Sequence, residues 1–351
     1  MDSGPVNVQA SWRHCGSVEV AEASREKRSE VTKALVTGGA GFIGSGLVKL
    51  LLREGYSARV LDLRRGRLDG IREAALEFVG LTSDGLNGGM ADRDIVDEAT
   101  RGVDVVYHLA LNWDGHSWGH HRSLGDLWNV NIRGTLNLLD AARAQRVEHF
   151  VYASSVAVYG KRTSPVMDEE AIPRPELWRG GPGPAYAIMK LALERLCLLY
   201  HVEHGLPITV FRIDVVFDDD EYLDLSQDTI RAAVRGEPLK VERGEAGASV
   251  HVDDVATAFL MASLNEKAYG QVLNLSNPRA LISDLEVCKL VIDVVRSESR
   301  IEFVESPLTG PVIGSVEKAE RLLGWKPVKG KKDLERTIVR MAQREAQRTL
   351  E

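Results

Sequence analysis

The stretch TGGAGFIG, Thr37 to Gly44, decides the fold, because it sets four glycines in eight residues directly behind the apolar run Ala34 to Val36. Glycine costs roughly 0.5–1 kcal/mol relative to alanine inside a regular element, so this density indicates that something approaches the backbone closely. Residues 33–37 are typical of a short buried strand, and residues 45–54 have the apolar spacing of a helix. The first amides of such a helix are unpaired and lie at the positive end of its dipole, which predicts a phosphate-binding site.

The spacing of the glycines is that of a dinucleotide-binding turn. The pattern G-x-G-x-x-G begins at Gly39, the related pattern G-x-x-G-x-x-G begins at Gly38, and both end at Gly44. We therefore expect Gly38, Gly41 and Gly44 to lie against the phosphates of a dinucleotide. The alternative is a glycine-rich turn without a ligand.

A second predicted strand, residues 58–63, carries Asp62 near its end. An acid about 20 residues beyond the glycines is placed to accept hydrogen bonds from the adenosine ribose. Arg64, Arg65 and Arg67 follow and are suited to a 2′-phosphate. Because Asp62 repels such a phosphate, we favour NAD as the cofactor, with NADP as the alternative.

The composition excludes several classes of protein. The chain has 351 residues, 44% hydrophobic and 27% charged, with a formal net charge of −7. This charge argues against nucleic acid or an anionic membrane as the main partner, and no apolar run approaches the roughly 20 residues of a membrane span. Cys15, Cys197 and Cys288 lack the spacing of a metal site or a disulfide framework, which indicates a reducing, cytoplasmic location. Residues 1–32 are polar and predict a poorly ordered extension.

Beyond the glycine turn, predicted strands and helices alternate as far as residue 214. This order predicts an α/β fold with a doubly wound parallel sheet, whose ligand lies outside the carboxyl ends of the strands. We expect residues 33–215 to form the NAD(P)-binding domain and residues 216–351 mainly a smaller substrate-binding lobe with C-terminal helices. The predicted strands lie at 76–81, 104–111, 149–155 and 208–214 and the predicted helices at 92–100, 126–145 and 185–204. Beyond residue 215 the pattern breaks into shorter pieces, including 229–235, 251–263 and 282–295, which we assign to the smaller lobe.

Ser155, Tyr186 and Lys190 form the candidate catalytic group. Ser155 ends a predicted strand, and Tyr186 and Lys190 lie four residues apart on one face of the following helix. Lowering the pKa of a phenol by about 3 units requires roughly 4 kcal/mol, within reach of a lysine plus an oxidised nicotinamide ring. Tyr186 can then exchange a proton with an alcohol or ketone that Ser155 holds. The alternative is a surface pair on a helix.

The sequence resembles the extended short-chain dehydrogenase/reductase family, whose members include NAD-dependent epimerases and dehydratases of nucleotide sugars. The resemblance covers about residues 33–330. It rests on Asp62 and on seven motifs, TGGAGFIG at 37–44, HLA at 108–110, NIRGT at 131–135, SSVAVYG at 154–160, YAIMK at 186–190, HVDDVA at 251–256 and LGWKP at 323–327.

This resemblance implies a Rossmann fold and bound NAD(P), with Ser155, Tyr186 and Lys190 as the catalytic residues. It also implies that Tyr186 and Lys190 contact the cofactor, Lys190 at the nicotinamide ribose. Further cofactor contacts are implied at Phe42, Ile43, Leu109 and Ala110. A homodimer is common in the family, and the apolar surface of helix 185–204 is too wide for one sheet face.

Several positions depart from the family pattern. Relatives that dehydrate or decarboxylate sugars have acids just after the catalytic Ser or Thr, where this chain has Val156 and Ala157, so neither reaction is expected. Three consecutive acids, Asp218 to Asp220, would repel a diphosphate if they faced it. In the family an arginine near residues 248–250 commonly binds the diphosphate, but this chain has Ala, Ser and Val there. Arg231, Arg235 or Arg243 are the candidate substitutes.

We expect the substrate to be a small molecule that contacts the aromatic loop after residue 111 and the end of the sixth strand. The candidate contacts are Trp113, His116, Trp118 and Asp214, and a metal site at His116, His120 and His121 is not expected. The leading interpretation is an epimerase of a sugar or nucleotide sugar. The alternatives are a dehydrogenase or carbonyl reductase on a non-nucleotide substrate and an NAD(P)-sensing protein without turnover.

Overall fold

The computed structural model describes residues 31–83, 87–112, 124–161, 164, 166–178, 183–242, 246–305 and 313–350. Residues 1–30 of the expected extension therefore lie outside the described residues. So does the loop 113–123, with Trp113, His116 and Trp118 among the predicted substrate contacts.

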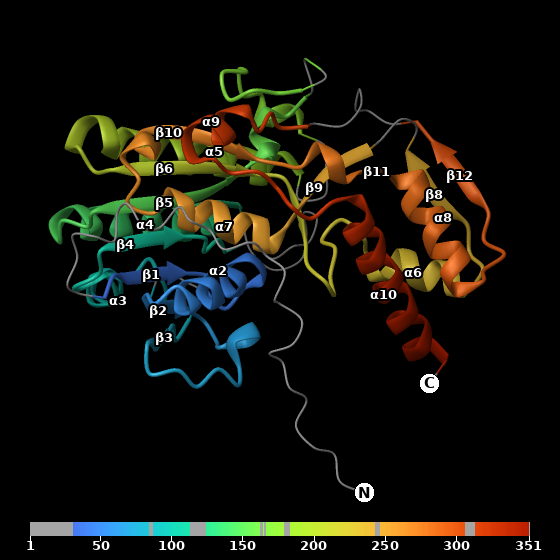
Figure 1. Ribbon diagram of the computed structural model, residues 1–351, viewed down its shortest axis with the longest axis horizontal. Coiled ribbons are helices and arrows are strands. Elements are labelled where there is room, and N and C mark those ends of the chain that lie inside the picture. The colour runs from blue at the N-terminus through green and yellow to red at the C-terminus, as the bar shows by residue number, and fades with distance from the viewer. Residues whose placement is uncertain are drawn as a thin grey trace, which may run out of the picture. The chain divides into compact units, whose positions relative to one another are not determined.

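Seven parallel strands form the central sheet (Figure 1). Their order across the sheet is β10-β6-β5-β4-β1-β2-β3. They are β1 (Lys33–Thr37), β2 (Ser57–Asp62), β3 (Leu76–Gly80), β4 (Val105–His108), β5 (His149–Ser155), β6 (Ile208–Ile213) and β10 (Gln271–Leu275). Thr37 pairs with His108 and Ser155 pairs with Ile213, so the carboxyl ends of β1, β4, β5 and β6 meet at one edge of the sheet.

Helices cover both faces of this sheet. On one face, α2 (Phe42–Arg53) and α7 (Val252–Ala262) pack against Val151 and Ala153 of β5. On the other, α3 (Arg93–Thr100), α4 (Leu124–Ala144) and α5 (Gly183–His204) pack against Phe150 and Tyr152. Successive residues of a strand point to opposite faces, so one apolar strand supplies both cores. The predicted doubly wound, Rossmann-type α/β fold is confirmed.

Two element boundaries near the glycine turn differ from the sequence prediction. Helix α2 begins at Phe42 rather than at residue 45, so Gly44 lies inside the helix. A Cβ atom on Gly44 would overlap the backbone of Gly38, which explains why a helical position requires glycine. Strand β4 ends at His108, three residues before the predicted end, where the chain passes Gly38.

The smaller lobe contains two short sheets and three helices with their own core. Strands β7 (Val215–Phe217), β9 (Ala246–His251) and β11 (Leu281–Ser283) form one sheet, and β8 (Leu239–Glu242) and β12 (Ile301–Val304) form the other. Helices α6 (Gln227–Val234), α8 (Asp284–Val295) and α10 (Lys331–Leu350) pack with them. Figure 1 shows this lobe beside the central sheet, with α10 in red.

The chain crosses between the two parts more than once. After β9 it returns to the central sheet as α7 and β10, and α9 (Glu317–Leu323) packs against the same core. The expected division of the chain at residue 215 stays a prediction. Among the described residues, none of the helices combines the length and the apolar character that a membrane crossing requires.

Candidate active site

The turn between β1 and α2 has the geometry of a phosphate cradle. Gly38 has φ +68°, and a Cβ atom there would lie 2.8 Å from the backbone nitrogen of Ala110. Gly41 is the N-cap residue of α2 and offers no side-chain cap to the first amides of the helix. These amides therefore present a positive end to a ligand, as the glycine spacing predicts.

Asp62 lies beside this turn at the end of β2. Its Oδ2 accepts a hydrogen bond from the backbone nitrogen of Ala40 at 2.9 Å, and Oδ1 accepts one from Leu63 at 2.7 Å. The carboxylate is thus held against the glycine turn. An acceptor in this position suits the hydroxyl groups of a ribose.

A cavity of about 440 Å³ brings half of the predicted cofactor residues together. Five of them line it, namely Gly38, Gly41, Asp62, Leu109 and Ala110. Phe42, Ile43 and Gly44 follow directly as the first residues of α2. The cavity also contacts β4 and α4 through His108, Asn131 and Thr135. It lies at the carboxyl ends of β1, β2 and β4, where this fold binds its ligands.

Ser155 and Tyr186 meet at the end of β5. Tyr186 lies in the first turn of α5 and is half-buried, and its phenol forms a side-chain hydrogen bond with Ser155. Burial raises the pKa of Tyr186, while the hydrogen bond with Ser155 lowers it, and the net direction is upward. The Ser155 hydroxyl also accepts from the backbone nitrogen of Ala157 at 3.2 Å. This pair can exchange a proton with an alcohol or carbonyl oxygen.

Lys190 lies one helical turn further along α5 and is only 6% exposed. Its Nζ donates to the carbonyl oxygen of Ala153 at 2.7 Å and lies 5.8 Å from the centre of the Tyr186 ring and 5.4 Å from that of Tyr152. Burial lowers the pKa of Lys190 to about 8. The ammonium is therefore near the phenol, but Lys190 alone does not make that phenol acidic.

His108 joins the turn to α4 at the floor of the cavity. Its Nδ1 lies 2.8 Å from the Thr37 hydroxyl and its Nε2 lies 2.9 Å from the Thr135 hydroxyl. Burial, with a smaller effect of Lys190, lowers the pKa of His108 to about 3, so the ring is neutral. The sequence analysis did not predict these contacts. All three residues nevertheless lie in motifs named above, Thr37 in TGGAGFIG, His108 in HLA and Thr135 in NIRGT.

Asn131 ties α4 to the chain beyond β4. Its Oδ1 accepts from the backbone nitrogen of Asn112 at 2.7 Å, and its Nδ2 donates to the carbonyl oxygen of Asn112 at 2.9 Å. The loop that leads into residues 113–123 is thereby anchored at its first residue.

Asp214 is buried at the end of β6 and bonded to protein groups. Its Oδ2 accepts from the Ser276 hydroxyl at 2.7 Å and its Oδ1 from the backbone nitrogen of Val215 at 2.9 Å. Burial raises its pKa from 3.8 to about 7. It joins the ends of β6 and β10, and a contact with substrate stays a prediction.

The acids at 218–220 and the arginines of the smaller lobe are engaged with one another and with other groups. Asp218 pairs with Arg67 at 3.0 Å, so its charge faces the region after β2. Arg231 pairs with Glu345 and Arg235 with Glu237, each at 2.6 Å, whereas Arg243 lies outside the described residues. Because Asp218 is paired with Arg67, its charge does not argue against a substrate that carries a diphosphate. Arg231 and Arg235, the candidate substitutes for the diphosphate-binding arginine, already pair with acids.

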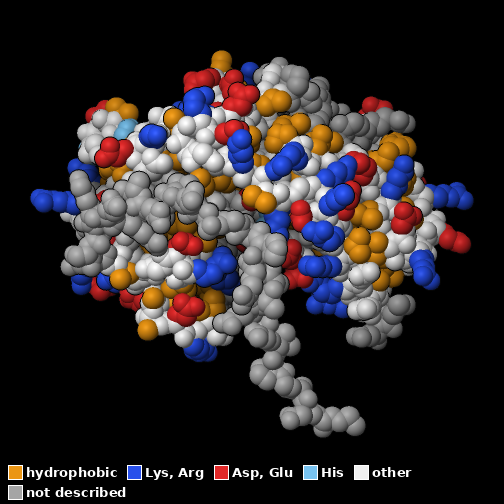
Figure 2. All heavy atoms as spheres, in the orientation of Figure 1, with side chains coloured by type: hydrophobic (Ala, Val, Ile, Leu, Met, Phe, Trp, Pro, Cys, Tyr) orange, Lys and Arg blue, Asp and Glu red, His pale blue; other side chains and the backbone are white. Residues whose placement is uncertain are grey.

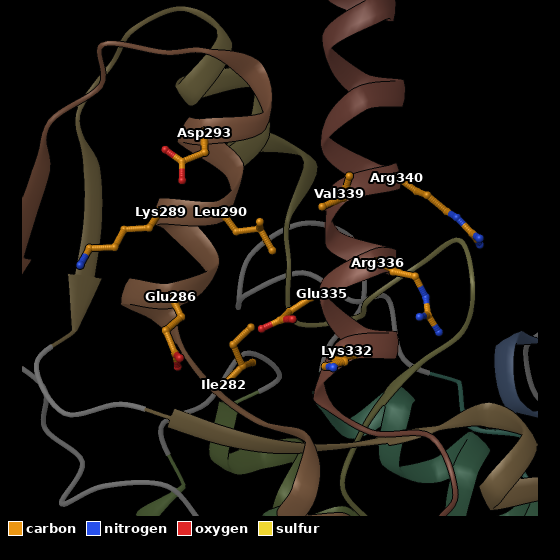
Figure 3. Close-up of a pocket in the computed structure, with 10 residues that line it drawn as sticks. All are labelled: Ile282, Glu286, Lys289, Leu290, Asp293, Lys332, Glu335, Arg336, Val339 and Arg340. Carbon is orange, nitrogen blue, oxygen red and sulfur yellow. The ribbon is translucent and has the colours of Figure 1, made fainter.

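A larger hollow of about 810 Å³ lies between α8 and α10 (Figure 3). Leu290 and Val339 point into it, while Arg336 and Arg340 point away. It contains none of the candidate residues and belongs to the smaller lobe alone. The strand ends of the central sheet, with their glycine turn and hydroxyl groups, are the candidate active site.

The fold and the glycine turn define a dinucleotide-binding protein of the doubly wound class. Residues 34–276 match the profile of the NAD dependent epimerase/dehydratase family, so the chain belongs to that family and is an enzyme of the extended short-chain dehydrogenase/reductase type.

The names of similar proteins describe enzymes that act on nucleotide sugars. UDP-glucuronic acid decarboxylase 1 of Danio rerio is 28% identical over 310 residues, which are 84% of this chain and 69% of that protein. UDP-glucuronate 4-epimerase of Thermodesulfobacterium geofontis is 26% identical over 323 residues, 87% and 94% of the two chains. The crystal structure of UDP-glucuronic acid 4-epimerase from Bacillus cereus with UDP-glucuronic acid and NAD has a TM-score of 0.73 at 25% identity and covers 89% of this chain and 99% of its own.

Proposed function

We propose that the protein is an NAD-dependent epimerase of a nucleotide sugar, with Ser155, Tyr186 and Lys190 as its catalytic residues. The observation that carries this proposal is the hydrogen-bonded pair of Ser155 and Tyr186 at the end of β5, one strand away from β4 and the dinucleotide cavity. The relatives named above support the substrate class, since their names specify UDP-sugars.

The residues of the glycine turn fit a bound dinucleotide. Gly38 lets the turn pack against the backbone of Ala110, which a Cβ atom would prevent, and Asp62 offers its carboxylate to the ribose. Bound there, NAD would supply a reversible hydride acceptor for the sugar carbon and the positive charge of its oxidised ring near Tyr186. We favour NAD over NADP because of the acid at position 62.

In this mechanism Tyr186 takes the proton from the sugar hydroxyl as the ketone forms. Ser155 donates a hydrogen bond to the same oxygen, and Lys190 keeps positive charge beside the phenolate. After the ketone has turned in the site, so that its opposite face would receive the hydride, Tyr186 returns the proton to the same oxygen. The buried residues that follow Ser155 are Val156 and Ala157, which carry no group able to move a second proton, and this favours epimerisation over dehydration or decarboxylation.

A second candidate is a dehydrogenase or carbonyl reductase on a non-nucleotide substrate. Residues 248–250 are buried in β9 and include no arginine, while Arg231 and Arg235 pair with acids. These observations favour a substrate without a diphosphate. We nevertheless favour a nucleotide-sugar substrate, because the relatives named above match most of the chain and their names specify such substrates.

The experiment uses the purified full-length protein. Heat denaturation should release NAD, and incubation with UDP-glucuronic acid or UDP-glucose should yield the C4 epimer without net change in NADH absorbance. Stoichiometric consumption of added NADH or NADPH with a ketone would instead establish the reductase. Binding of NAD with no turnover of any tested sugar or ketone would leave a cofactor-sensing protein.

We also propose a cytoplasmic homodimer that acts on a small molecule. On α5, Leu199 is 48% exposed and Val202 is 77% exposed, an apolar surface that a second subunit would cover. Cys197 and Cys288 are free and buried, which agrees with a reducing compartment. The absence of a metal cofactor stays a prediction. Light scattering tests the dimer, and a monomer at micromolar concentration would contradict it.

A further inference from the structure

Two acids of the smaller lobe hold an arginine that follows β2. The Arg67 Nη1 atom lies 3.0 Å from the Asp218 Oδ2 atom, and its second terminal nitrogen pairs with Glu221. All three side chains keep some contact with solvent, Asp218 the least at 18%. Arg67 thus carries two acidic partners from a segment more than 150 positions away in the chain.

Arg67 also lies against the dinucleotide turn. Its backbone nitrogen donates to the carbonyl oxygen of Ala40 at 3.2 Å, and its guanidinium lies 4.6 Å from the centre of the Phe42 ring. The nitrogen of the same Ala40 donates to Asp62. Asp62 and the backbone of Arg67 therefore both bond to Ala40, so the segment that carries Arg67 lies next to the carboxylate of Asp62. Arg65 instead lies over Phe78 on β3, at 5.2 Å.

The acidic turn, residues 218–221, is fixed in place by α10. Thr337 Oγ1 donates to the carbonyl oxygen of residue 218 at 2.6 Å, Arg340 to that of residue 219 at 2.8 Å, and Arg344 to that of residue 220 at 2.6 Å. Figure 3 shows Arg340 turned away from the hollow beside α8, and Figure 2 shows Lys and Arg side chains gathered over α10.

The side chain of Asp218 also closes the turn on itself. Its Oδ1 accepts from the backbone nitrogens of residues 220 and 221, both at 2.7 Å, which leaves Oδ2 for Arg67. The acids are consequently held toward the arginine by the backbone rather than by chance contact of two long side chains.

We propose that Asp218 and Glu221 make the enzyme select NAD over NADP. The inference rests on the proposed dinucleotide site, and it assigns the selection to the smaller lobe as well as to Asp62. A 2′-phosphate adds negative charge next to Asp62 and requires a cation there. Arg67 is a cation beside the turn, and the two acids both neutralise it and repel the phosphate. A plain 2′-hydroxyl brings no charge and needs no free arginine.

The test measures binding of NADH and NADPH to nucleotide-free full-length protein by nicotinamide fluorescence. The variants are Asp218→Asn, Glu221→Gln, the double variant, and the double variant with Arg67→Gln. Asparagine keeps the Oδ1 acceptor of the turn. Asp220→Asn is the control of matched charge, because the described contacts of Asp220 are made by its backbone.

We expect the double variant to bind NADPH about tenfold more tightly than the wild type, the combined effect of two partly exposed ion pairs, with NADH affinity changed less than about twofold. Adding Arg67→Gln should remove the gain, and Asp220→Asn should produce none. Equal wild-type affinity for the two cofactors, an unchanged NADPH affinity in the double variant, or a gain that survives Arg67→Gln would overturn the inference.

Failure of this inference is separable from failure of the proposed function. A wild type that binds neither cofactor would refute the dinucleotide site itself. A wild type that binds NADH but whose variants show no change in NADPH affinity refutes only the role of the two acids. NADH binding by each variant reports its folding, and Glu221→Gln alone retains the test if Asp218 proves necessary for the turn.

Discussion

Glu194 and Arg212 form an ion pair that is almost fully excluded from solvent, with Oε1 of the acid 2.7 Å from Nη2 of the arginine. Ser154 donates a further hydrogen bond to the Glu194 carboxylate at 3.1 Å, and the guanidinium lies 4.8 Å from the centre of the Tyr159 ring. These contacts tie α5, which carries Tyr186, to β5 and β6. The helix position that presents the phenol therefore depends on a pair of buried charges.

Removing the acid of this pair should strongly destabilise the fold. Glu194→Gln leaves the Arg212 charge buried without a counter-charge, and we expect it to lower the free energy of unfolding by about 3–5 kcal/mol. Urea denaturation followed by far-UV circular dichroism measures the change. An exposed pair provides the control, since Arg235→Gln breaks a contact between half-exposed side chains and should have little effect.

Replacing both charges separates burial from pairing. Glu194→Leu with Arg212→Met should recover most of the stability that Glu194→Gln loses, because neither charge then remains buried. If the double variant is as unstable as the single one, the pair acts through its hydrogen bonds to the neighbouring strands and not through charge compensation.

This pair also shows where sequence reasoning stops. Arg212 lies in a predicted strand, but its partner lies on another element, in an apolar helical stretch where Glu194 resembles a solvated position. The same holds for Arg67, whose acids come from the smaller lobe. Which long-range charges meet depends on how two parts of the chain pack, and local spacing carries no information about that.

Local spacing did suffice where one short segment forms a site by itself. The glycine turn and the acid after β2 follow from backbone geometry within about 25 residues, and the doubly wound sheet follows from the alternation of strands and helices. Ser155 and Tyr186 could be brought together because consecutive parallel strands end at the same edge. The raised pKa of Tyr186 could not be predicted, because it depends on the burial of the phenol.

Tyr186→Phe should abolish turnover while leaving the cofactor site intact. Loss of the proton-transferring hydroxyl should lower kcat by at least about 10²-fold. NADH affinity measured by fluorescence should stay close to that of the wild type. Tyr200→Phe on the same helix is the matched control, since its hydroxyl donates to Asp140 of α4 at 2.7 Å and takes no part in the candidate site. Comparable rates for the two variants would exclude Tyr186 as the catalytic acid and base.

Asp214→Asn should stabilise the protein at neutral and basic pH. The raised pKa means that the folded chain keeps a proton on Asp214 that the unfolded chain loses between about pH 4 and pH 7. The contribution of Asp214 to stability is therefore present below pH 4 and lost as pH rises to 7. Asparagine can serve both Val215 and Ser276 without a charge, so we expect a gain of about 2–4 kcal/mol at pH 8 and none at pH 4.

Denaturant unfolding measured at pH 4.0 and at pH 8.0 checks the direction of this change in stability. The basic value lies about one unit above the upper end of the titration range. A variant that is less stable than the wild type at pH 8 would show that the ionised carboxylate is favourable in the fold. If the variant is more stable but has lost turnover, the buried acid is retained for a functional contact, as the predicted substrate role requires.

Gly38→Ala should eliminate cofactor binding and cost more stability than a positive φ alone explains. The residue has φ +68°, which costs a non-glycine residue about 1–2 kcal/mol, and the new Cβ atom would also lie 2.8 Å from the backbone nitrogen of Ala110. Gly55→Ala is the matched control, because Gly55 has φ +80° but its Cβ position has no neighbour within 4 Å. The difference between the two variants in thermal unfolding isolates the close approach of β4 to the turn, and the difference in NADH affinity isolates the phosphate cradle. Equal losses of stability with normal NADH binding in both variants would mean that Gly38 serves only its backbone conformation.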